Sequence, residues 1–432
     1  MKILIIGSGG REHALAQAYA KSHRVKKVLV APGNDFMEES SSKIHVFPHI
    51  SLLDFDSILE LATKHQVDLV DVAQDNALAE GFVDKFAKRG FAAFGPQKAA
   101  AEIEWNKQWA RDFMKKYHLP IPRFEAFTKA SDAVSYVNKL PEQMLFIKAS
   151  GLAFGKGVLR AETKDQALVA IKAMKQFSTA GKTFLIEEGM VGEEFSLFAI
   201  CDGRRYIIAG TAQDHKTVYN ADQGPNTGGM GCAAPTSLLK KQTISQIKRL
   251  ILNPFMHGMG KEERPYSGIL YLGGMMTKDG PKIVEFNSRW GEPEADVILP
   301  GLQTDYADIV QAVMMQELMT TSIKFDDKVR VSVAGCAQGY PADIEKAKGK
   351  KIYGLHDAMK LPGITVFGAG IKRKGNNYIV NGGRIFHLVA EGKTIAEARE
   401  RAYAAMSHIF VEGNNLHYRT DIGWREVERI HG

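Results

Sequence analysis

Cysteine is scarce in this sequence. Among 432 residues there are three, Cys201, Cys232 and Cys336, and they lie far apart. Their spacing fits no metal-binding pattern, and so few isolated thiols exclude a disulfide framework. Small, buried, reduced side chains are the simplest interpretation, and they favour a protein of the reducing cytoplasm.

Long hydrophobic runs are also missing. No apolar stretch in the sequence approaches the ~20 residues of a membrane-spanning helix. The chain opens on a short strand-like segment rather than on the charged, apolar and cleavage regions of a secretory leader. We therefore expect no membrane partner.

Aromatic residues do not accompany the basic ones. The net charge is +7, yet Lys and Arg are scattered and cluster only briefly, as in 346–351 and 372–374. A surface for nucleic acid needs aromatic side chains among such clusters, so that bases can stack on them. We expect no nucleic-acid partner, because anionic small molecules, above all phosphates, account for the charge equally well.

The order of elements indicates several structural units, since a chain of this length exceeds one hydrophobic core. Strand-like and helical segments alternate over residues 2–103, which predicts a parallel sheet of βαβ units. Residues 78–89 favour one helix in this part, and residues 97–117 favour another helix that leads out of it. Residues 124–191 favour a small α+β unit. From residue 328, short strands with glycine turns precede one long helix, 394–409, which predicts an antiparallel sheet with a covering helix.

The central prediction concerns the strand-like segment that contains Glu285. In a strand, side chains two apart point the same way. Glu285 and Asn287 then share one face, which Arg289 continues, while Val284 and Phe286 pack on the other. A carboxylate and an amide oxygen suit Mg²⁺ that is bound together with phosphate. An ordinary edge strand with polar residues outward is the alternative, and this segment alone does not exclude it.

Two glycine-rich loops favour phosphate. The first, residues 7–10, joins a strand to a helix, whose free backbone N–H groups attract anions. It lacks the dinucleotide fingerprint, because Glu12 stands where the third glycine belongs. The second, 149–158, follows Lys148 and contains three glycines, which suits a phosphate cover. A tight turn and a plain hairpin turn are the respective alternatives.

Two further polar segments are candidates for a site. The acidic residues of 187–194 could hydrogen-bond a ribose, although solvated charge is equally compatible with them. Residues 213–231 form a glycine-rich stretch too long for a simple turn, and long structured loops are usually functional.

Taken together, these segments resemble the glycinamide ribonucleotide synthetase family (phosphoribosylamine–glycine ligases), which are ATP-grasp enzymes of purine biosynthesis. The resemblance runs almost end to end. It rests on residues 7–14 (GSGGREHA), 148–158, 213–216, 224–231 (GPNTGGMG), 285–294 and 421–424 (DIGW). Together these motifs are highly specific, whereas any one alone would not be.

The resemblance implies the fold class, which is α/β and α+β in several domains. We expect an N-terminal Rossmann-like domain with a parallel sheet over 1–103 and an ATP-grasp central domain over 104–123 and 190–327. A lid subdomain would occupy 124–189, and a C-terminal α+β domain with an antiparallel sheet 328–432. A monomer or weak homodimer is expected.

The resemblance also implies the reaction. ATP would activate glycine as glycyl phosphate, and phosphoribosylamine would then displace phosphate to give glycinamide ribonucleotide. Carboxylate and ATP repel one another, so the site must concentrate positive charge. The acyl phosphate hydrolyses readily, so a glycine-rich lid that excludes water is expected. The expected cofactors are ATP and Mg²⁺ or Mn²⁺.

Site residues follow from the same resemblance. Glu285 and Asn287 would hold the metal. Residues expected to bind ATP are Lys107, Lys148, Gly151, Gly155, Lys156, Gly157, Glu187, Glu188 and Glu194. Residues expected at the reacting groups are Arg289, Asp214 and Lys216. Residues expected to bind the other substrates are Asn226, Thr227 and Gly229, with Gly9, Gly10 and Arg11 facing phosphoribosylamine.

The chain departs from the family pattern at four places. Residues 73–78 read Ala-Gln-Asp-Asn-Ala-Leu where Gly-Pro-Glu-x-Pro-Leu is usual, and Ser150, Glu292 and Gly368 replace Asp, Asp and His. The residues for ATP and metal are intact. Two alternatives therefore stay open: a related ligase for another acid–amine pair, and a nucleotide-binding protein without catalysis. The second is motivated by the strand before Glu285, which carries no carboxylate.

Overall fold

The N-terminal part of the chain is a five-stranded parallel sheet. The computed structural model describes residues 1–152 and 157–431. The strands lie in the order β3 (Ile44–Val46), β2 (Lys27–Pro32), β1 (Lys2–Gly7), β4 (Leu69–Val72) and β5 (Ala93–Phe94). The helices of this part are α1 (Gly10–Lys21), α2 (Phe55–His65), α3 (Asp75–Ala79) and α4 (Phe82–Lys88). Because β1 is central and covered on both faces, its residues 3–6 are wholly buried. The predicted βαβ order is confirmed.

One predicted helix, over 78–89, is wrong in its continuity. The helical segment begins earlier, at Asp75, and is interrupted before Phe82. Gly81 causes the interruption, since its φ of +73° lies in the left-handed region that favours glycine.

The predicted helix over 97–117 is also two helices, α5 (Lys98–Trp105) and α6 (Lys107–Lys116). Asn106 separates them, and its side-chain oxygen accepts a hydrogen bond from the Trp109 backbone N–H at 3.1 Å. This N-cap fixes where α6 begins, and so places Lys107 at its first turn.

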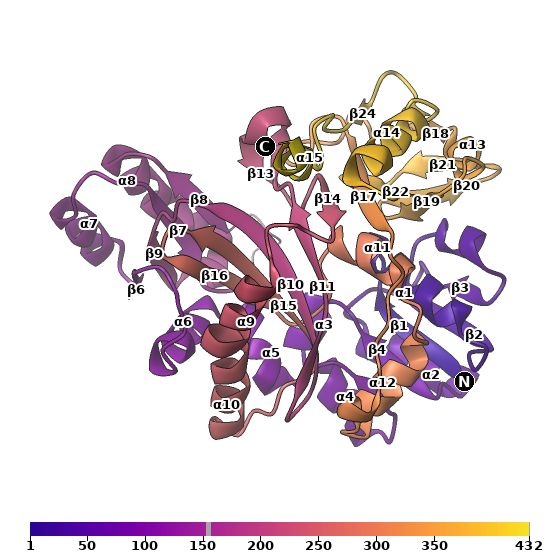
Figure 1. Cartoon of the computed structure of the whole chain (residues 1–432), viewed down its shortest axis with the longest axis horizontal. Helices are drawn as coiled ribbons and strands as arrows, with labels where there is room; N and C mark the ends of the chain where they lie inside the picture. The colour runs from indigo at the N-terminus through magenta and orange to yellow at the C-terminus, as the bar shows by residue number, and fades with distance from the viewer. Residues whose placement is uncertain (153–156, 432) are drawn as a thin grey trace.

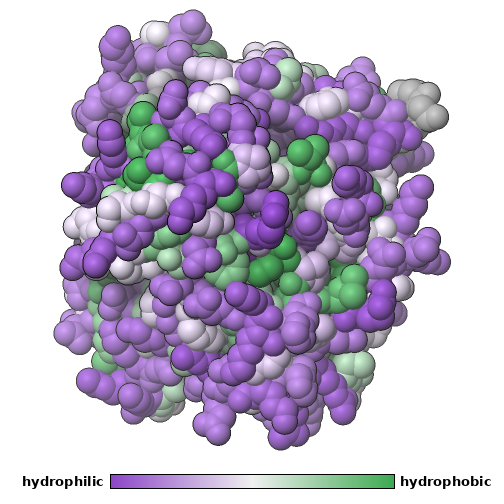
Figure 2. All heavy atoms as spheres, turned by 90° about the vertical axis from the view of Figure 1, so that its left-hand side faces the viewer, coloured by the Kyte–Doolittle hydropathy of each residue, from purple (hydrophilic) through white to green (hydrophobic). Residues whose placement is uncertain are grey.

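A four-stranded antiparallel sheet forms the small unit at the left of Figure 1. Its strands lie in the order β6 (Phe124–Phe127), β9 (Phe184–Glu188), β7 (Leu145–Ala149) and β8 (Val158–Ala161). The helices α7 (Ala130–Lys139) and α8 (Lys164–Ala173) accompany it. Figure 2 looks onto this side of the molecule, which is mainly hydrophilic with apolar side chains in separate groups.

The largest sheet has nine strands and joins the middle of the chain to its end. The path is β16 (Gly280–Asn287), β15 (Ser267–Thr277), β10 (Glu193–Asp202), β11 (Tyr206–Asp214), β14 (Gly231–Ala234), β17 (Val329–Ala337), β22 (Arg384–Gly392) and β19 (Ile364–Gly368), with β24 (Leu416–His417) on β17. The junction is the antiparallel pair β14–β17. The glycine-rich segment 224–231 runs into β14 and therefore meets the C-terminal part of the chain.

The C-terminal part matches the predicted antiparallel sheet with a covering helix, α14 (Ile395–Met406). A second sheet contains β20 (Ile371–Lys374), β21 (Asn377–Val380), β18 (Lys351–Tyr353) and β23 (Phe410–Val411). The remaining elements are α9 (Lys241–Ile247), α10 (Asn253–Lys261), α11 (Glu294–Ile298), α12 (Tyr306–Met314), α13 (Leu355–Met359), α15 (Trp424–His431), the ribbon β12 (Thr217–Tyr219) and β13 (Gln223–Asn226), and short turns of helix at Met37–Ser40, Met174–Gly181, Asn220–Asp222, Lys248–Leu252, Leu299–Gly301 and Leu318–Thr320.

Two expectations from composition can be compared with this fold. The three cysteine thiols are free and buried. Within residues 1–152 and 157–431, no helix combines the length and apolar character needed to cross a membrane.

Candidate active site

A cavity of about 270 Å³ lies between β16, the small unit and the segment 224–231. The predicted site residues that line it are Lys107, Lys148, Gly157, Glu187, Glu188, Glu194, Asp214, Lys216, Asn226, Thr227, Glu285, Asn287 and Arg289. The predicted residues that do not line it are Gly9, Gly10, Arg11, Gly151 and Gly229. Gly229 nevertheless adjoins the cavity, since a Cβ there would lie 2.9 Å from Asp214 Oδ1. Gly155 and Lys156 fall outside the described residues. Side chains that are far apart in the sequence thus gather around one cavity.

Glu285 and Asn287 line the cavity from β16, as predicted. The pairing of β15 with β16 contains a bulge, because its register shifts by one residue at Val284. Val284 therefore also lines the cavity, while Ile283 and Phe286 are buried in the core. The prediction that Val284 packs beside Phe286 is wrong for this reason.

Glu104, on α5, is a site residue that the sequence did not indicate. Its buried carboxylate accepts hydrogen bonds from Asn287 Nδ2 at 3.1 Å and from the Ser288 backbone N–H at 2.7 Å, and it pairs with Arg289 at 2.9 Å. Because the Asn287 amide nitrogen meets Glu104, the amide oxygen is left for another partner. No motif marks Glu104, since an acid in an amphipathic helix is usually a solvated charge.

Among the described residues, four cationic side chains line the same cavity: Lys107, Lys148, Lys216 and Arg289. Lys216 Nζ lies 3.9 Å from Glu285 Oε1. Partial loss of solvent within the cavity would by itself raise the pKa of Glu285, but these cations, with Lys216 first, hold it below its usual value. Burial lowers the pKa of Lys107, and the neighbouring Lys148 lowers it further against the effect of Glu285. Such a concentration of positive charge suits a polyphosphate.

Glu187 is engaged by cations from two elements. Arg111 donates to its two oxygens at 2.6 and 2.9 Å, and Lys148 Nζ lies 2.7 Å from Oε2. Burial would raise the pKa of Glu187, but Arg111 and Lys148 hold it at about 2. Because both oxygens are engaged, this carboxylate orients Lys148. Glu188 is engaged in a similar way, since its two oxygens accept from the Arg123 backbone N–H at 3.0 Å and from Arg123 Nε at 2.6 Å. Of the three predicted acids, Glu194 is therefore the one best placed to meet a ribose.

Asp214 places a buried carboxylate at the cavity. Its Oδ1 has no hydrogen-bond partner in the part of the chain that the structure describes. Burial, and then the neighbouring Glu294, raise the pKa of Asp214 well above its usual range. Glu294 is fixed by a hydrogen bond from Ser196 Oγ at 2.8 Å. Two carboxylates so placed favour a cation between them, such as an ammonium group.

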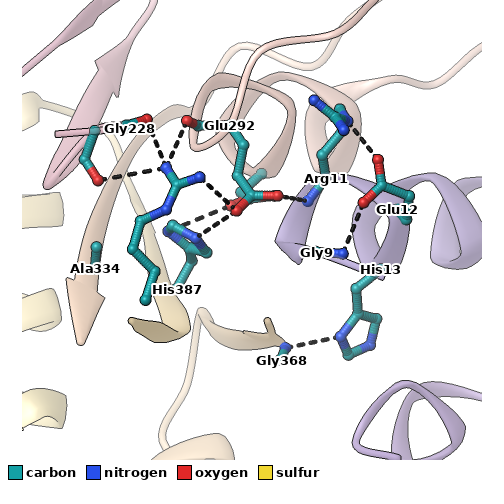
Figure 3. A network of polar contacts seen from close by, with 12 residues as sticks. Gly9, Arg11, Glu12, His13, Gly228, Glu292, Ala334, Gly368 and His387 are labelled. Atoms are coloured by element: carbon teal, nitrogen blue, oxygen red, sulfur yellow. Dashed lines mark hydrogen bonds and ion pairs between the residues drawn. The ribbon is translucent and has the colours of Figure 1, made fainter. Parts of the chain in front are cut away.

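The N-terminus of α1 is occupied by two carboxylates from the protein itself. Glu12 Oε2 accepts from the Gly9 N–H at 2.7 Å, and Glu292 Oε2 accepts from the Arg11 N–H at 3.0 Å (Figure 3). A Cβ on Gly9 would lie 2.2 Å from Glu292 Oε2, so any larger residue there would displace the Glu292 carboxylate. That Gly9, Gly10 and Arg11 face phosphoribosylamine stays a prediction, and it requires Glu292 to move or to share this space.

The fold and the site together define the class of the protein. A biotin carboxylase from Campylobacter jejuni has the same fold, with a TM-score of 0.71 and 16% identity over 96% of this chain and 92% of its own. The family model for the phosphoribosylglycinamide synthetase ATP-grasp (A) domain matches residues 105–295, which include Lys107, Lys148, Glu285 and Asn287. The chain is therefore an ATP-grasp enzyme, and the expected fold class is confirmed.

The family is equally well defined. Models for the phosphoribosylglycinamide synthetase N and C domains match residues 1–104 and 330–425. The phosphoribosylamine–glycine ligase of Streptococcus pneumoniae strain R6 is 40% identical over 99% of this chain and 100% of its own. That of Caldanaerobacter subterraneus is 38% identical over 98% and 99%. The crystal structure of the Thermotoga maritima ligase is similar with a TM-score of 0.83 and 31% identity, over 98% of this chain and all of its own. The chain belongs to the phosphoribosylglycinamide synthetase family, a family of ATP-dependent ligases.

Proposed function

We propose that this protein joins glycine to phosphoribosylamine at the expense of ATP, giving glycinamide ribonucleotide, ADP and phosphate in purine biosynthesis. The observation that carries the proposal is the cavity in which Glu285 and Asn287 lie among four cations. A site that brings a carboxylate to ATP must offset their mutual repulsion, and this arrangement supplies the charge for it.

Lys107 and Lys148 would bind the phosphates of ATP, because both line the cavity and Lys148 is oriented by Glu187. Glu194 would meet the ribose. The Glu285 carboxylate and the Asn287 oxygen fit Mg²⁺ or Mn²⁺, as hard oxygen ligands that leave most positions to phosphate and water. When bound, the metal would offset the charge of the phosphate oxygens.

In the first step, a carboxylate oxygen of glycine would attack the γ-phosphorus of ATP. The P–O bond to ADP breaks, and glycyl phosphate forms. Arg289 and Lys216 would offset the charge of the transferring group, since both line the cavity beside Glu285. Asp214 and Glu294 would hold the glycine ammonium group, whose positive charge would offset the negative charge of these two neighbouring carboxylates.

In the second step, the amine nitrogen of phosphoribosylamine would attack the acyl carbon. A C–N bond forms, the C–O bond to the phosphoryl group breaks, phosphate leaves with the bridging oxygen, and the nitrogen loses a proton to solvent. Asn226, Thr227 and Gly229 would border the acceptor. The glycine-rich loop with Gly151, Gly155, Lys156 and Gly157 would cover the phosphates and exclude water, as expected from the sequence.

A ligase for another acid–amine pair is the second candidate. Two positions at which the chain departs from the family pattern, Asp75 and Glu292, line the same cavity as the ATP residues. Residues that line the cavity can contact a substrate, so a substitution there can alter substrate specificity. A substitution elsewhere on the surface would leave the specificity unchanged.

A coupled assay of ADP release tests the proposal. With ATP and Mg²⁺ present, glycine and phosphoribosylamine are each omitted in turn, and ADP should form rapidly only with both. If glycine leaves the rate unchanged when the amine is present, the proposed reaction is wrong. A screen of other acids with the same readout then decides whether the second candidate holds.

The proposal places the enzyme in the cytoplasm as a monomer or weak homodimer, with no membrane or nucleic-acid partner. Free, buried cysteines support a reducing compartment. Sedimentation over a range of protein concentrations measures the oligomeric state.

A further inference from the structure

Glu292 lies where three parts of the chain meet (Figure 3). One carboxylate oxygen accepts from the Arg11 N–H at the start of α1, at 3.0 Å. The other lies 2.9 Å from Arg384 Nη2 and 3.4 Å from His387 Nε2, both on β22. Glu292 is therefore bound to the N-terminal and the C-terminal parts of the chain at once, while it also lines the cavity.

Arg384 extends this junction to the glycine-rich segment. Its Nη1 donates to the carbonyl oxygens of Gly228, at 2.5 Å, and of Glu292, at 2.9 Å. Its guanidinium also packs on Gly228, where a Cβ would lie 3.0 Å from Cζ. One planar side chain thus joins two backbone segments that border the cavity and pairs with the Glu292 carboxylate.

The segment held by Arg384 also holds Lys216. Thr227 donates to the Lys216 carbonyl oxygen from its backbone N–H, at 2.7 Å, and from Oγ1, at 2.8 Å. Gly229 in turn donates to Thr227 Oγ1 at 3.0 Å. A continuous set of contacts therefore runs from Glu292 through Arg384 to the backbone of a lysine in the cavity.

We propose that Glu292 and Arg384 are positioning residues of the active site. Arg384, from the C-terminal part of the chain, holds residues 226–229 against the cavity, and Glu292 fixes Arg384 by spanning the distance to the start of α1. The length of the side chain at 292 then matters: aspartate, one methylene shorter, cannot keep both the Arg11 and the Arg384 contacts in this backbone position.

We expect a selective change in the KM values of the substrates, and this kinetic test rests on the proposed function. Glu292→Asp should raise the KM for glycine or phosphoribosylamine by about tenfold, because one hydrogen-bonded contact that positions the site is lost. The KM for ATP should be unchanged. The matched control is Glu39→Asp, which shortens another acid between the N- and C-terminal parts. Glu39 pairs with Arg373 at 2.8 Å and does not border the cavity, so its variant should behave as the wild type.

A second readout does not depend on activity. Amide hydrogen exchange of segment 224–231 should be faster in Glu292→Asp than in the wild type, and unchanged in Glu39→Asp. Arg384→Lys keeps the charge but removes the planar fork, and it should reproduce both effects if Glu292→Asp does not fold.

Unchanged exchange in folded Glu292→Asp or Arg384→Lys would overturn the inference, and so would an equal rise in the KM for ATP. A wild-type enzyme without glycine-dependent ADP release would instead refute the proposed function and leave the exchange result to decide the positioning role.

Discussion

The two ends of the cavity differ in how their side chains are held. At the metal and phosphate end, Glu285, Asn287 and Lys148 project from strands, and their order along each strand sets their spacing. At the other end, Glu292 and Arg384 meet across 92 residues of sequence and hold a loop. Strand geometry therefore spaces the side chains of the first end, although Glu104 on a distant helix also orients Asn287. The second end is held by long-range contacts throughout.

The departures from the family pattern follow the same division except at Ser150, which lies beside Lys107. Glu285, Asn287, Lys107 and Lys148 stand as the family has them, whereas Glu292 lies at the long-range end. A site placed by strand geometry tolerates little change in residue type. A site placed by contacts between distant segments can be rebuilt, because a change in one partner can be offset in another.

The largest effect should come from the metal end. Glu285→Ala should lower Mg²⁺-dependent ADP release by about 100-fold or more, since the carboxylate is the one acidic ligand proposed for the metal. The melting temperature should change little, because the side chain is 40% exposed. Asp279→Ala, in the exposed turn of the same hairpin, is the matched control. Near-normal turnover of Glu285→Ala would show that the metal lies elsewhere.

The next effect concerns stability at the phosphate end. Glu187→Gln leaves Arg111 and Lys148 without their carboxylate, and breaking such a buried pair costs about 3–5 kcal/mol. The neighbouring Glu188 pairs with Arg123, which is 81% exposed, so Glu188→Gln should lose at most about 1 kcal/mol. Chemical denaturation measures both variants. Equal losses would mean that burial does not distinguish these two acids.

The same pair predicts a dependence on pH. The folded-state pKa of Glu187, about 2, is below its unfolded value of about 4.3. Its contribution to stability is therefore complete above pH ~4.3 and is lost as the pH falls towards 2. Denaturation of wild type and Glu187→Gln at several pH values should give a difference that shrinks over this acidic range. A difference that stays constant from pH 6 to 2 would contradict the assigned pairing.

A third effect tests the long-range end. A Cβ on Gly10 would lie 2.5 Å from His387 Cδ2, so Gly10→Ala should displace α1 or the imidazole and lower kcat/KM by about tenfold. Adding His387→Ala removes the clash and should restore most of the activity. If the double variant stays impaired, Gly10 instead contacts the acceptor directly, as the sequence predicts.

These cases show which features of the fold and of the site can be predicted from the sequence. The strand with Glu285 and Asn287 was predictable because alternation and residue type are local signals. The bulge at Val284 was not, since it depends on the pairing with β15. Glu104 meets Asn287 across 183 residues, and Arg111 meets Glu187 across 76. No local pattern encodes such contacts. The sequence therefore predicted the residues that form the site, but not Glu104 and Arg111, which orient them.

The smallest effect should come from the one departure at the phosphate end, Ser150. Its carbonyl oxygen accepts from the Lys107 N–H at 2.9 Å, and its Oγ from the Gln108 N–H at 3.1 Å, so Ser150 caps α6 beside Asn106. The family's aspartate would keep that acceptor and add a negative charge at a helix N-terminus, which is favourable by about 0.3–1 kcal/mol. Ser150→Asp should therefore raise the melting temperature slightly and leave every KM within about twofold. Ser150→Ala, which leaves the Gln108 N–H unpaired, is the control and should lose about 1 kcal/mol. A change of substrate preference in Ser150→Asp would place a specificity determinant at the end of the cavity where strand geometry predicts none.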